Sequence, residues 1–312
     1  MNLVLDFDGT ITTRDTVYQL ASAAIAAQKR ATGADLQPQW DAILRGYHDD
    51  LAAFDRRYRP AEADRTDVEE ELRYLAQLSV VEAASIERVE AAGIFAGLAQ
   101  ADLFGMGAGL AADGTVALRA GLRELLGLAG RQGWRASVLS VNWSGAFIRG
   151  VLHGHGIECG GVAVVANELD EQGRVLGPEI LLGGKEKQEG EGEGEGEDRR
   201  RRRLMTAADK GECLARMTGG SASATLYVGD SPTDLACLLH GRGVAIAEDA
   251  GSALMKTLAR VGVRVPPVAD GDALAAQGKG PGGVDISWAR DFRDILQSEP
   301  TLACRGTKGP VL

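Results

Sequence analysis

The chain has 312 residues, of which 45% are hydrophobic, and its formal net charge is −10 at pH 7. This length suits one large α/β domain with an inserted subdomain, or two domains. The negative charge argues against nonspecific binding to nucleic acids or anionic membranes, and no apolar run is long enough to span a bilayer. We therefore expect neither a nucleic-acid nor a membrane partner.

The cysteines are scattered without a CxxC spacing. This is typical of free thiols in a reducing compartment, and not of a disulfide framework or a zinc site. We expect no cleaved leader, because the first predicted strand begins at Leu3 and cleavage would remove it. The sequence therefore predicts a cytoplasmic protein, and it gives no indication of the oligomeric state.

The apolar run Leu3–Leu5 predicts a strand that is buried in a parallel sheet, and it ends at Asp6-Phe7-Asp8-Gly9-Thr10. Asp6 and Asp8 would share a face if the strand continued. At ~4 Å and an effective dielectric of about 20, their repulsion would be on the order of 4 kcal/mol. This indicates a nearby cation, and a hard divalent ion with oxygen ligands is the natural candidate. The alternative is a simple strand-ending turn, since Asp and Gly are common turn residues.

Residues 16–112 carry apolar side chains at helical spacing and give no strand signal. The second strand of an α/β domain would normally follow much sooner. We therefore predict an inserted all-helical domain that lies over the crevice at the end of the first strand. Such a lid excludes water and selects substrates.

An alternation of helices and strands resumes after residue 112. Strands are predicted at 135–139, 161–166, 224–228 and 243–246, and a hairpin tip at 170–178. The stretch 266–283 is rich in Pro and Gly and is predicted to be a loop. We predict a last surface helix at 286–296 and a mobile tail beyond Ser298.

Residues 184–203 form a low-complexity segment, in which a Glu-Gly alternation precedes the arginines Arg199 to Arg203. The segment has no apolar side chain whose burial would offset the entropy of ordering, so we predict a disordered insertion within the core. The arginine run is compatible with a nuclear address or a nucleic-acid patch. Seven acidic residues balance seven basic ones here, which favours a plain loop insertion.

Polar residues follow three of the predicted strands, namely Asp6 with Asp8, Ser140, and Asp230 with Asp234. Ligands bind outside the carboxyl ends of the strands in open α/β sheets, so we expect these residues to converge. Lys210, on the helix before the last of these strands, adds a cation. Carboxylates, a hydroxyl and an ammonium group without a triad histidine suit phosphoryl transfer.

Four stretches resemble, in order, the four motifs of the haloacid dehalogenase-like (HAD) superfamily: Asp6-Phe7-Asp8-Gly9-Thr10, Ser140, Lys210 and Gly229-Asp230-Ser231-Pro232-Thr233-Asp234. The resemblance covers about residues 1–265. It implies a Rossmann-like core with a mainly parallel sheet flanked by helices, built from residues 1–15 and 113–265, with residues 266–312 as a C-terminal extension. Residues 16–112 resemble the C1 cap of the phosphoserine phosphatase-like branch. The amino-acid sequence around Ser140 resembles that of fungal HAD-like hydrolases.

The resemblance implies a Mg²⁺-dependent phosphomonoester hydrolase with an aspartyl-phosphate intermediate. Asp6 would be the nucleophile, and Asp8 would protonate the leaving group and then activate water. Ser140 and Lys210 would hold the phosphate. The implied metal site comprises Asp6, the backbone carbonyl of Asp8, Asp230 and Asp234, of which Asp234 would position a metal-bound water or Lys210. The implied substrate-binding residues are Gly9, Thr10, Asp15, Val141 and Asn142.

The chain departs from the phosphoserine phosphatase pattern at two positions. Thr233 stands where that group commonly has Asn, which bears on the metal geometry. Asp15 stands where that group has an acidic residue that recognises the substrate amine, and Asp is shorter, so serine phosphate is not implied as the substrate. Arg56 and Arg57 are candidates for binding a substrate carboxylate, although solvated charges are the simpler interpretation.

A full helical cap disfavours protein and nucleic-acid substrates, so we expect a small phosphorylated metabolite. Two alternatives stay open: a phosphotransferase or mutase on the same scaffold, and a catalytically silent protein that binds a phosphorylated metabolite. A dehalogenase is disfavoured, because that chemistry does not need the acid at Asp8.

Overall fold

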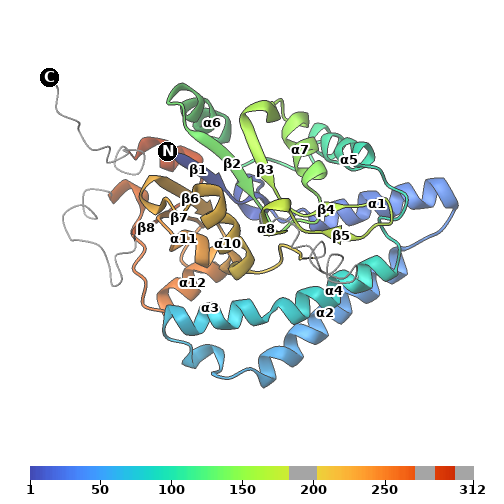
Figure 1. The fold of residues 1–312 in the computed structure, drawn as a ribbon, viewed down its shortest axis with the longest axis horizontal. Coiled ribbons are helices and arrows are strands. Elements are labelled where there is room, and N and C mark those ends of the chain that lie inside the picture. Colours follow the sequence, from blue (N-terminus) through green and yellow to red (C-terminus); the bar gives the residue numbers. More distant parts are fainter. Residues whose placement is uncertain (183–201, 271–284, 299–312) are drawn as a thin grey trace, which may run out of the picture.

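A computed structural model describes residues 1–182, 202–270 and 285–298. Its centre is a six-stranded parallel sheet in the order β3-β2-β1-β6-β7-β8 (Figure 1). The strands are β1 (Asn2–Leu5), β2 (Arg135–Leu139), β3 (Val162–Val165), β6 (Thr225–Gly229), β7 (Arg242–Ile246) and β8 (Asp285–Ala289). The strand order reverses at β1, which lies between β2 and β6. The predicted α/β class with a mainly parallel sheet is confirmed.

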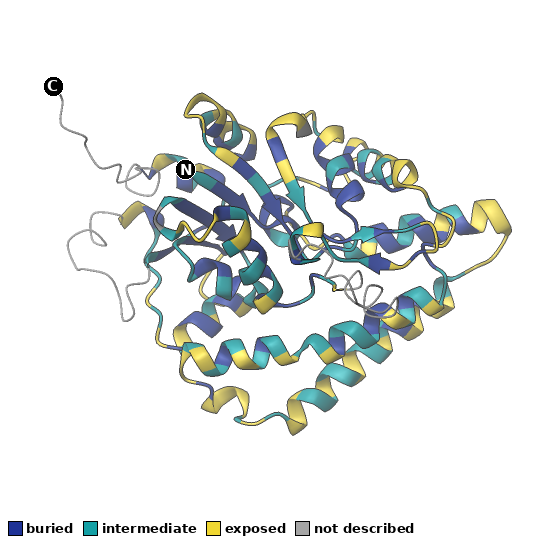
Figure 2. Ribbon diagram, viewed as in Figure 1, coloured by how far each residue is buried: buried dark blue, intermediate teal, exposed yellow. Residues whose placement is uncertain are grey.

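The central strand β1 is buried on both faces, as its uninterrupted apolar sequence requires. Leu3 and Leu5 pack on one face with the helices α6 (Leu122–Arg131), α7 (Gly145–Gly154) and α14 (Phe292–Gln297). Val4 packs on the opposite face with α8 (Glu179–Leu182), α10 (Ala207–Thr218), α11 (Leu235–Leu238) and α12 (Ala253–Arg260). Figure 2 shows the buried residues concentrated along these central strands. The alternation follows from the period of two along a strand.

Five helices, which we call the cap helices, fill the region between β1 and α6. They are α1 (Val17–Thr32), α2 (Gln37–Arg57), α3 (Val68–Gln77), α4 (Ser79–Ala91) and α5 (Gln100–Ala112). This stretch contains no strand, as its helical spacing predicts. Figure 1 shows α2, α3 and α4 running together beside the core, while α5 lies against α7. A Cβ at Gly150 of α7 would lie 2.0 Å from the carbonyl oxygen of Phe104 in α5, so this close packing requires glycine.

Short elements complete the chain. A two-stranded antiparallel sheet pairs β4 (Glu168–Leu169) with β5 (Val175–Leu176), where the hairpin was predicted. The single turns are η1 (Phe7–Ile11), η2 (Glu62–Asp64), η3 (Cys159–Gly161), η4 (Ala222–Ala224), η5 (Pro232–Asp234) and η6 (Val268–Asp270). Among the helices described, none is long and apolar enough to cross a membrane.

The prediction of a helix at 286–296 is correct only for residues 292–296, which lie in a helix, and wrong for the residues before them. Residues Asp285–Ala289 form β8, which pairs in parallel with β7 at the edge of the sheet, and a short helix α14 follows. Ile286 and Ala289 are buried, so packing against the sheet outweighs the local preference for a helix. The predicted C-terminal extension therefore contributes a strand to the core sheet. The predicted tail beyond Ser298 lies outside the described residues.

The structure describes only the last two residues of the predicted disordered insertion. Residues 184–201 lie outside the described part of the chain, but Arg202 and Arg203 are placed. Arg203 forms an ion pair of 2.6 Å with Glu90 of α4 and donates to the carbonyl oxygen of Val175 at 3.0 Å. Arg202 pairs with Glu212 of α10. These two arginines therefore contact both the cap helices and the core, because partners far away in sequence supply their counter-charges.

A buried cluster of charges connects α3 of the cap helices to α12 of the core. Glu71, 2% exposed, accepts hydrogen bonds from Arg65 Nε at 2.7 Å and from Arg260 Nη1 at 2.9 Å. The guanidinium of Arg65 also lies 3.7 Å from the ring centroid of Tyr74. Burial tends to raise the pKa of Glu71, but the hydrogen bonds and charges of the two arginines outweigh it and lower that pKa below 4.5.

We expect Glu71→Gln to lower the free energy of unfolding at pH 7 by about 3 kcal/mol, because it leaves two arginine charges without their shared partner. Urea unfolding at pH 7 measures the change. Glu69→Gln on the same helix is the control; that carboxylate is exposed and lies 3.9 Å from Arg73, so its loss should change the free energy by less than about 0.5 kcal/mol. Equal effects of the two substitutions would contradict the interpretation.

The pH dependence of unfolding provides a second test of the role of Glu71 with the same variant. Because the folded-state pKa of Glu71 lies below its ordinary value of 4.5, folding favours the ionised form. Its contribution is complete above that value and is lost as the pH falls through the folded-state pKa. The difference between wild type and Glu71→Gln should therefore be constant near neutrality and shrink as the pH falls below 4.5.

Candidate active site

The turn η1 carries the chain out of β1 and into the crevice at the carboxyl ends of the strands. The backbone N–H of Asp6 donates to the carbonyl oxygen of Val228 at 2.9 Å and so continues the pairing with β6. Gly9 then adopts φ +75°, and a Cβ there would lie 2.3 Å from Asp230 Oδ2. Glycine at this position therefore allows the first turn and the loop after β6 to approach each other.

Three carboxylates and one ammonium group meet in this crevice. Asp6, Asp230 and Asp234 each offer an oxygen, and these oxygens lie within 4.8 Å of one another. Lys210 of α10 is fully buried, and its Nζ lies 2.6 Å from both Asp6 Oδ1 and Asp234 Oδ1. The predicted convergence of these four residues is thus observed. When all four groups are ionised, three negative charges face one positive charge.

Asp234 organises the loop that carries Asp230. Its Oδ1 accepts from Lys210 and from the hydroxyl of Tyr227 at 2.6 Å. Its Oδ2 accepts from the backbone N–H of Asp230 at 3.1 Å and from the N–H and hydroxyl of Ser231. Both oxygens are therefore engaged by the protein, which gives Asp234 a positioning role toward Lys210 and this loop.

Asp6 and Asp230 each keep one carboxylate oxygen for a ligand. Asp6 Oδ1 binds Lys210, and Asp230 Oδ1 accepts from the hydroxyl of Thr10 at 2.7 Å. Their Oδ2 atoms make no hydrogen bond to any residue that the structure describes. Of the carboxylates present, these two are therefore the ones that fit a hard divalent cation, which prefers oxygen ligands.

The electrostatics of the crevice favour an additional cation. Burial, reinforced by the charge of Asp234, raises the pKa of Asp6 well above its ordinary value and that of Asp230 to about 6. Burial disfavours the charge of Lys210, but Asp234 and Asp6 outweigh it and raise the pKa of the amine. Raised carboxylate pKa values beside a firmly charged lysine indicate negative charge in excess, which a divalent ion would relieve.

Asp8 points away from this cluster and is held by different partners. Its Oδ1 accepts from the N–H and hydroxyl of Thr16 at 2.8 and 2.6 Å, and its Oδ2 accepts from Asn142 Nδ2 at 2.8 Å. Burial, with a smaller effect from the charge of Asp15, raises the pKa of Asp8 to about 6. Its carboxylate is not part of the group of oxygens that would hold a metal, so the two first-motif acids have separate environments.

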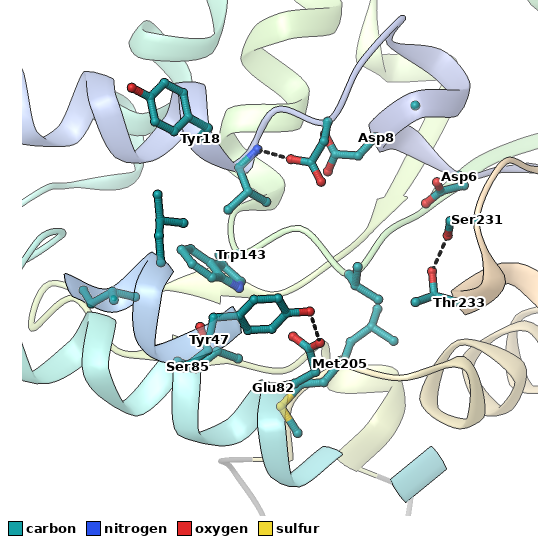
Figure 3. A pocket seen from close by; sticks show the side chains of 18 of the residues that line it. Asp6, Asp8, Tyr18, Tyr47, Glu82, Ser85, Trp143, Met205, Ser231 and Thr233 are labelled. Atoms are coloured by element: carbon teal, nitrogen blue, oxygen red, sulfur yellow. Dashed lines mark hydrogen bonds between the residues drawn. The ribbon is translucent and has the colours of Figure 1, made fainter. Parts of the chain in front are cut away.

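A cavity of about 500 Å³ lies between this crevice and the cap helices. Asp6, Asp8, Gly9, Lys210 and Asp230 line its core end. Helices α1, α2 and α4 line the other end. Figure 3 shows Asp6 and the Ser231–Thr233 pair on one side, and Trp143, Tyr47, Glu82 and Ser85 on the other.

The remaining predicted residues divide into two groups. Asp15 and Val141 line the cavity, and Asp15 is exposed and accepts from the N–H of Val17 at 2.8 Å. Ser140, Asn142 and Thr10 are fully buried and do not line it. The Ser140 hydroxyl accepts from the N–H of Asn142 at 3.1 Å, while Asn142 and Thr10 hold Asp8 and Asp230. Asn142 and Thr10 thus position acids, while Ser140 contacts the backbone of Asn142.

The family model of haloacid dehalogenase-like hydrolases matches residues 3–239. The chain belongs to this family. The HAD motifs identified in the sequence lie within the matched span, and the structure brings their acids and lysine together at one end of the sheet.

Among individual proteins, a CTO1-family protein of Schizosaccharomyces pombe is 28% identical over 255 residues, which covers 76% of this HAD-family chain and 78% of that protein. A phosphoserine phosphatase structure with a phospho-aspartyl intermediate analogue is 14% identical, covers 95% of this chain and 96% of its own, and has a TM-score of 0.46. A cytosolic 5′-nucleotidase IIIB bound to cytidine is 15% identical, covers 80% and 74% of the two chains, and has a TM-score of 0.43.

Sequence reasoning missed several residues that complete the site. Thr16 is the first residue of the predicted helical insertion, yet its hydroxyl holds Asp8. Tyr227 was one residue of a buried strand, yet its hydroxyl holds Asp234. Arg119 donates to the carbonyl oxygens of Gly9 and Thr10 at 2.6 and 3.2 Å. None of the three belongs to a motif, so no local signal identified them.

We expect Lys210→Met to destabilise the fold by about 3–5 kcal/mol at pH 7, because it leaves Asp6 and Asp234 buried without their shared ammonium group. Urea unfolding without added divalent cation measures this. Lys256→Met, on the exposed side of α12, is the control and should stay within about 0.5 kcal/mol of wild type. If the two variants unfold alike, Lys210 does not compensate these carboxylates.

Proposed function

We propose that this chain is a Mg²⁺-dependent phosphomonoester hydrolase that acts on a small phosphorylated metabolite through an aspartyl-phosphate on Asp6. The observation that carries the proposal is the shared contact of Lys210 with Asp6 and Asp234, next to Asp230, at one end of the cavity. This set supplies a nucleophile, a cation for phosphate oxygens and carboxylates for a metal.

Asp6 and Asp230 are the residues that would hold Mg²⁺, with the backbone carbonyl of Asp8 as a further ligand by family resemblance. When bound, the ion neutralises charge on the phosphate oxygens and on the attacking carboxylate. Lys210 keeps its proton and holds the carboxylate of Asp6 in place from the opposite side. Asp234 fixes Lys210 and the loop of Asp230.

The reaction uses the two first-motif acids in sequence. A carboxylate oxygen of Asp6 attacks phosphorus, the bond from phosphorus to the alcohol oxygen breaks, and that oxygen takes the proton of Asp8. Asp8 then removes a proton from water, whose oxygen attacks phosphorus as the bond to Asp6 breaks, which releases phosphate and restores both acids. The raised pKa of Asp8, about 6, supports this role, because its carboxyl group holds a proton more firmly than an ordinary aspartic acid.

The cap helices act in this proposal as the C1 cap of residues 16–112. Helices α1, α2 and α4 line the cavity together with the core residues, so substrate must fit between them. This supports a small metabolite as substrate and disfavours a folded protein or a nucleic acid.

Asp6→Asn should lower the Mg²⁺-dependent release of phosphate from 4-nitrophenyl phosphate by about 10³-fold or more, because the nucleophile is lost. Asp49→Asn, a substitution of an exposed carboxylate of α2, should leave the rate unchanged.

Chelation by EDTA should abolish turnover, and rapid quenching should trap a phosphoryl group on the peptide that contains Asp6. Absence of phosphate release from a broad panel of phosphorylated metabolites would instead favour a binding protein, and transfer to an added alcohol in place of water would favour a phosphotransferase.

Asp8→Asn should lower the rate of hydrolysis most for those esters whose leaving group must be protonated. Hydrolysis of an alkyl phosphate should fall by about 10²–10⁴-fold. The first step with 4-nitrophenyl phosphate should fall much less, because nitrophenolate leaves without protonation. Burst kinetics with the two substrates separate this step from water attack. Equal losses in the first step would argue against a proton-donating role for Asp8.

A further inference from the structure

The end of the cavity farthest from Asp6 has aromatic walls. Trp40 of α2 and Trp143, which follows β2, contact each other edge to face, with ring centroids 6.3 Å apart at 84°. The ring centroid of Tyr18 in α1 lies 6.5 Å from that of Trp40, and the ring centroid of Phe95 lies 6.1 Å from that of Trp143. Flat apolar groups bind well against such rings, because large apolar area is buried in offset or edge-to-face contact.

One carboxylate oxygen in these walls is available to a ligand. Glu82 of α4 lines the cavity and accepts a hydrogen bond from the hydroxyl of Tyr47 at 3.0 Å through Oε1 (Figure 3), while its Oε2 makes no hydrogen bond within the described residues. A carboxylate oxygen that faces a cavity without a protein partner favours a ligand that brings a hydrogen-bond donor to it.

The charges along the cavity disfavour an anionic leaving group. Among the described residues that line it, Lys210 and His48 are the basic ones. Lys210 is already shared by two carboxylates, and His48 is exposed. Arg56 and Arg57, the candidates for a substrate carboxylate, are exposed and do not line the cavity. A carboxylate placed beside Glu82 would therefore meet repulsion without a compensating cation.

We propose, on the basis of the proposed phosphatase function, that the alcohol part of the substrate is an aromatic or heteroaromatic group without a carboxylate, recognised by a hydrogen bond to Glu82. Phosphoserine, an aliphatic ester with a carboxylate, is then a poor substrate. Glu82 and the aromatic walls determine specificity, and the core residues perform the chemistry. Burial raises the pKa of Glu82, which agrees with a carboxylate that lacks a cationic partner.

A series of phosphate esters with matched benzylic leaving groups tests this. The series is 3-(aminomethyl)benzyl phosphate, benzyl phosphate and 3-carboxybenzyl phosphate, with propyl phosphate as the aliphatic member. We expect kcat/KM to be highest for the amine, lower for benzyl phosphate and lowest for the carboxylate. The overall decrease should be about tenfold or more, which is the effect of one charge-assisted hydrogen bond. Benzyl phosphate should exceed propyl phosphate, because it contacts the aromatic walls.

Variants assign the preference to Glu82. Glu82→Gln should reduce the ratio of kcat/KM between the amine and carboxylate esters to about threefold or less. Glu87→Gln, a substitution of an exposed carboxylate on the same helix, should leave the ratio as in wild type.

Failure of this inference and failure of the phosphatase function give different results. Turnover of all four esters with equal kcat/KM, or the same ratios in Glu82→Gln as in wild type, would overturn the specificity inference and leave the phosphatase intact. Absence of any Mg²⁺-dependent turnover, including that of 4-nitrophenyl phosphate, would overturn the phosphatase. The inference then rests on calorimetric binding of the free alcohols, where 3-(aminomethyl)benzyl alcohol must bind more tightly than 3-(hydroxymethyl)benzoate; equal binding would overturn it.

Discussion

The site depends on one buried ammonium group held between two carboxylates. Lys210 comes from α10, Asp6 from the end of β1 and Asp234 from the turn after β6, so its two contacts of 2.6 Å join three elements. The sheet brings these elements together because β1 and β6 are neighbours in register. An ion pair removed from water is stabilising only if its geometry is good and its remaining polar atoms are satisfied. Tyr227 and the backbone of the Asp230 loop meet that requirement for Asp234.

The same arrangement leaves the crevice negatively charged, and this links stability to function. Asp230 and Asp6 keep unpaired oxygens in a buried setting, which costs folding free energy and raises their pKa values. A packed apolar substitute would be more stable, but it could not perform the metal binding and phosphoryl transfer that we propose for this site. Sites that keep such uncompensated charge are commonly functional. Gly9 contributes to this arrangement, because the absence of a side chain there lets Asp230 approach the first turn.

The motifs made the acids, the lysine and the sheet class predictable, because the carboxyl ends of neighbouring parallel strands must meet. The strand order at the far edge was not predictable in the same way. Ile286 and Ala289 fit a short helix as well as a strand, and only the free edge of β7 decides between them. Arg203 looked like part of a solvated run, because its partner Glu90 is distant in sequence. Thr16 and Tyr227 were missed for the same reason: a hydroxyl that holds a carboxylate leaves no mark on periodicity or spacing.

The cavity joins two surfaces of different origin, and this separates chemistry from recognition. The reacting end is made by strand ends, where the register of β1 and β6 sets positions closely. The other end is made by α1, α2 and α4, whose distance from the core depends on packing between elements. Arg203 with Glu90, and Arg65 and Arg260 with Glu71, tie these helices to the core through buried or half-buried charges. The shape of this end of the cavity is therefore controlled by contacts far from Asp6. Under the proposed function, changes in the cap helices can alter selectivity while Asp6, Lys210 and Asp230 stay in place.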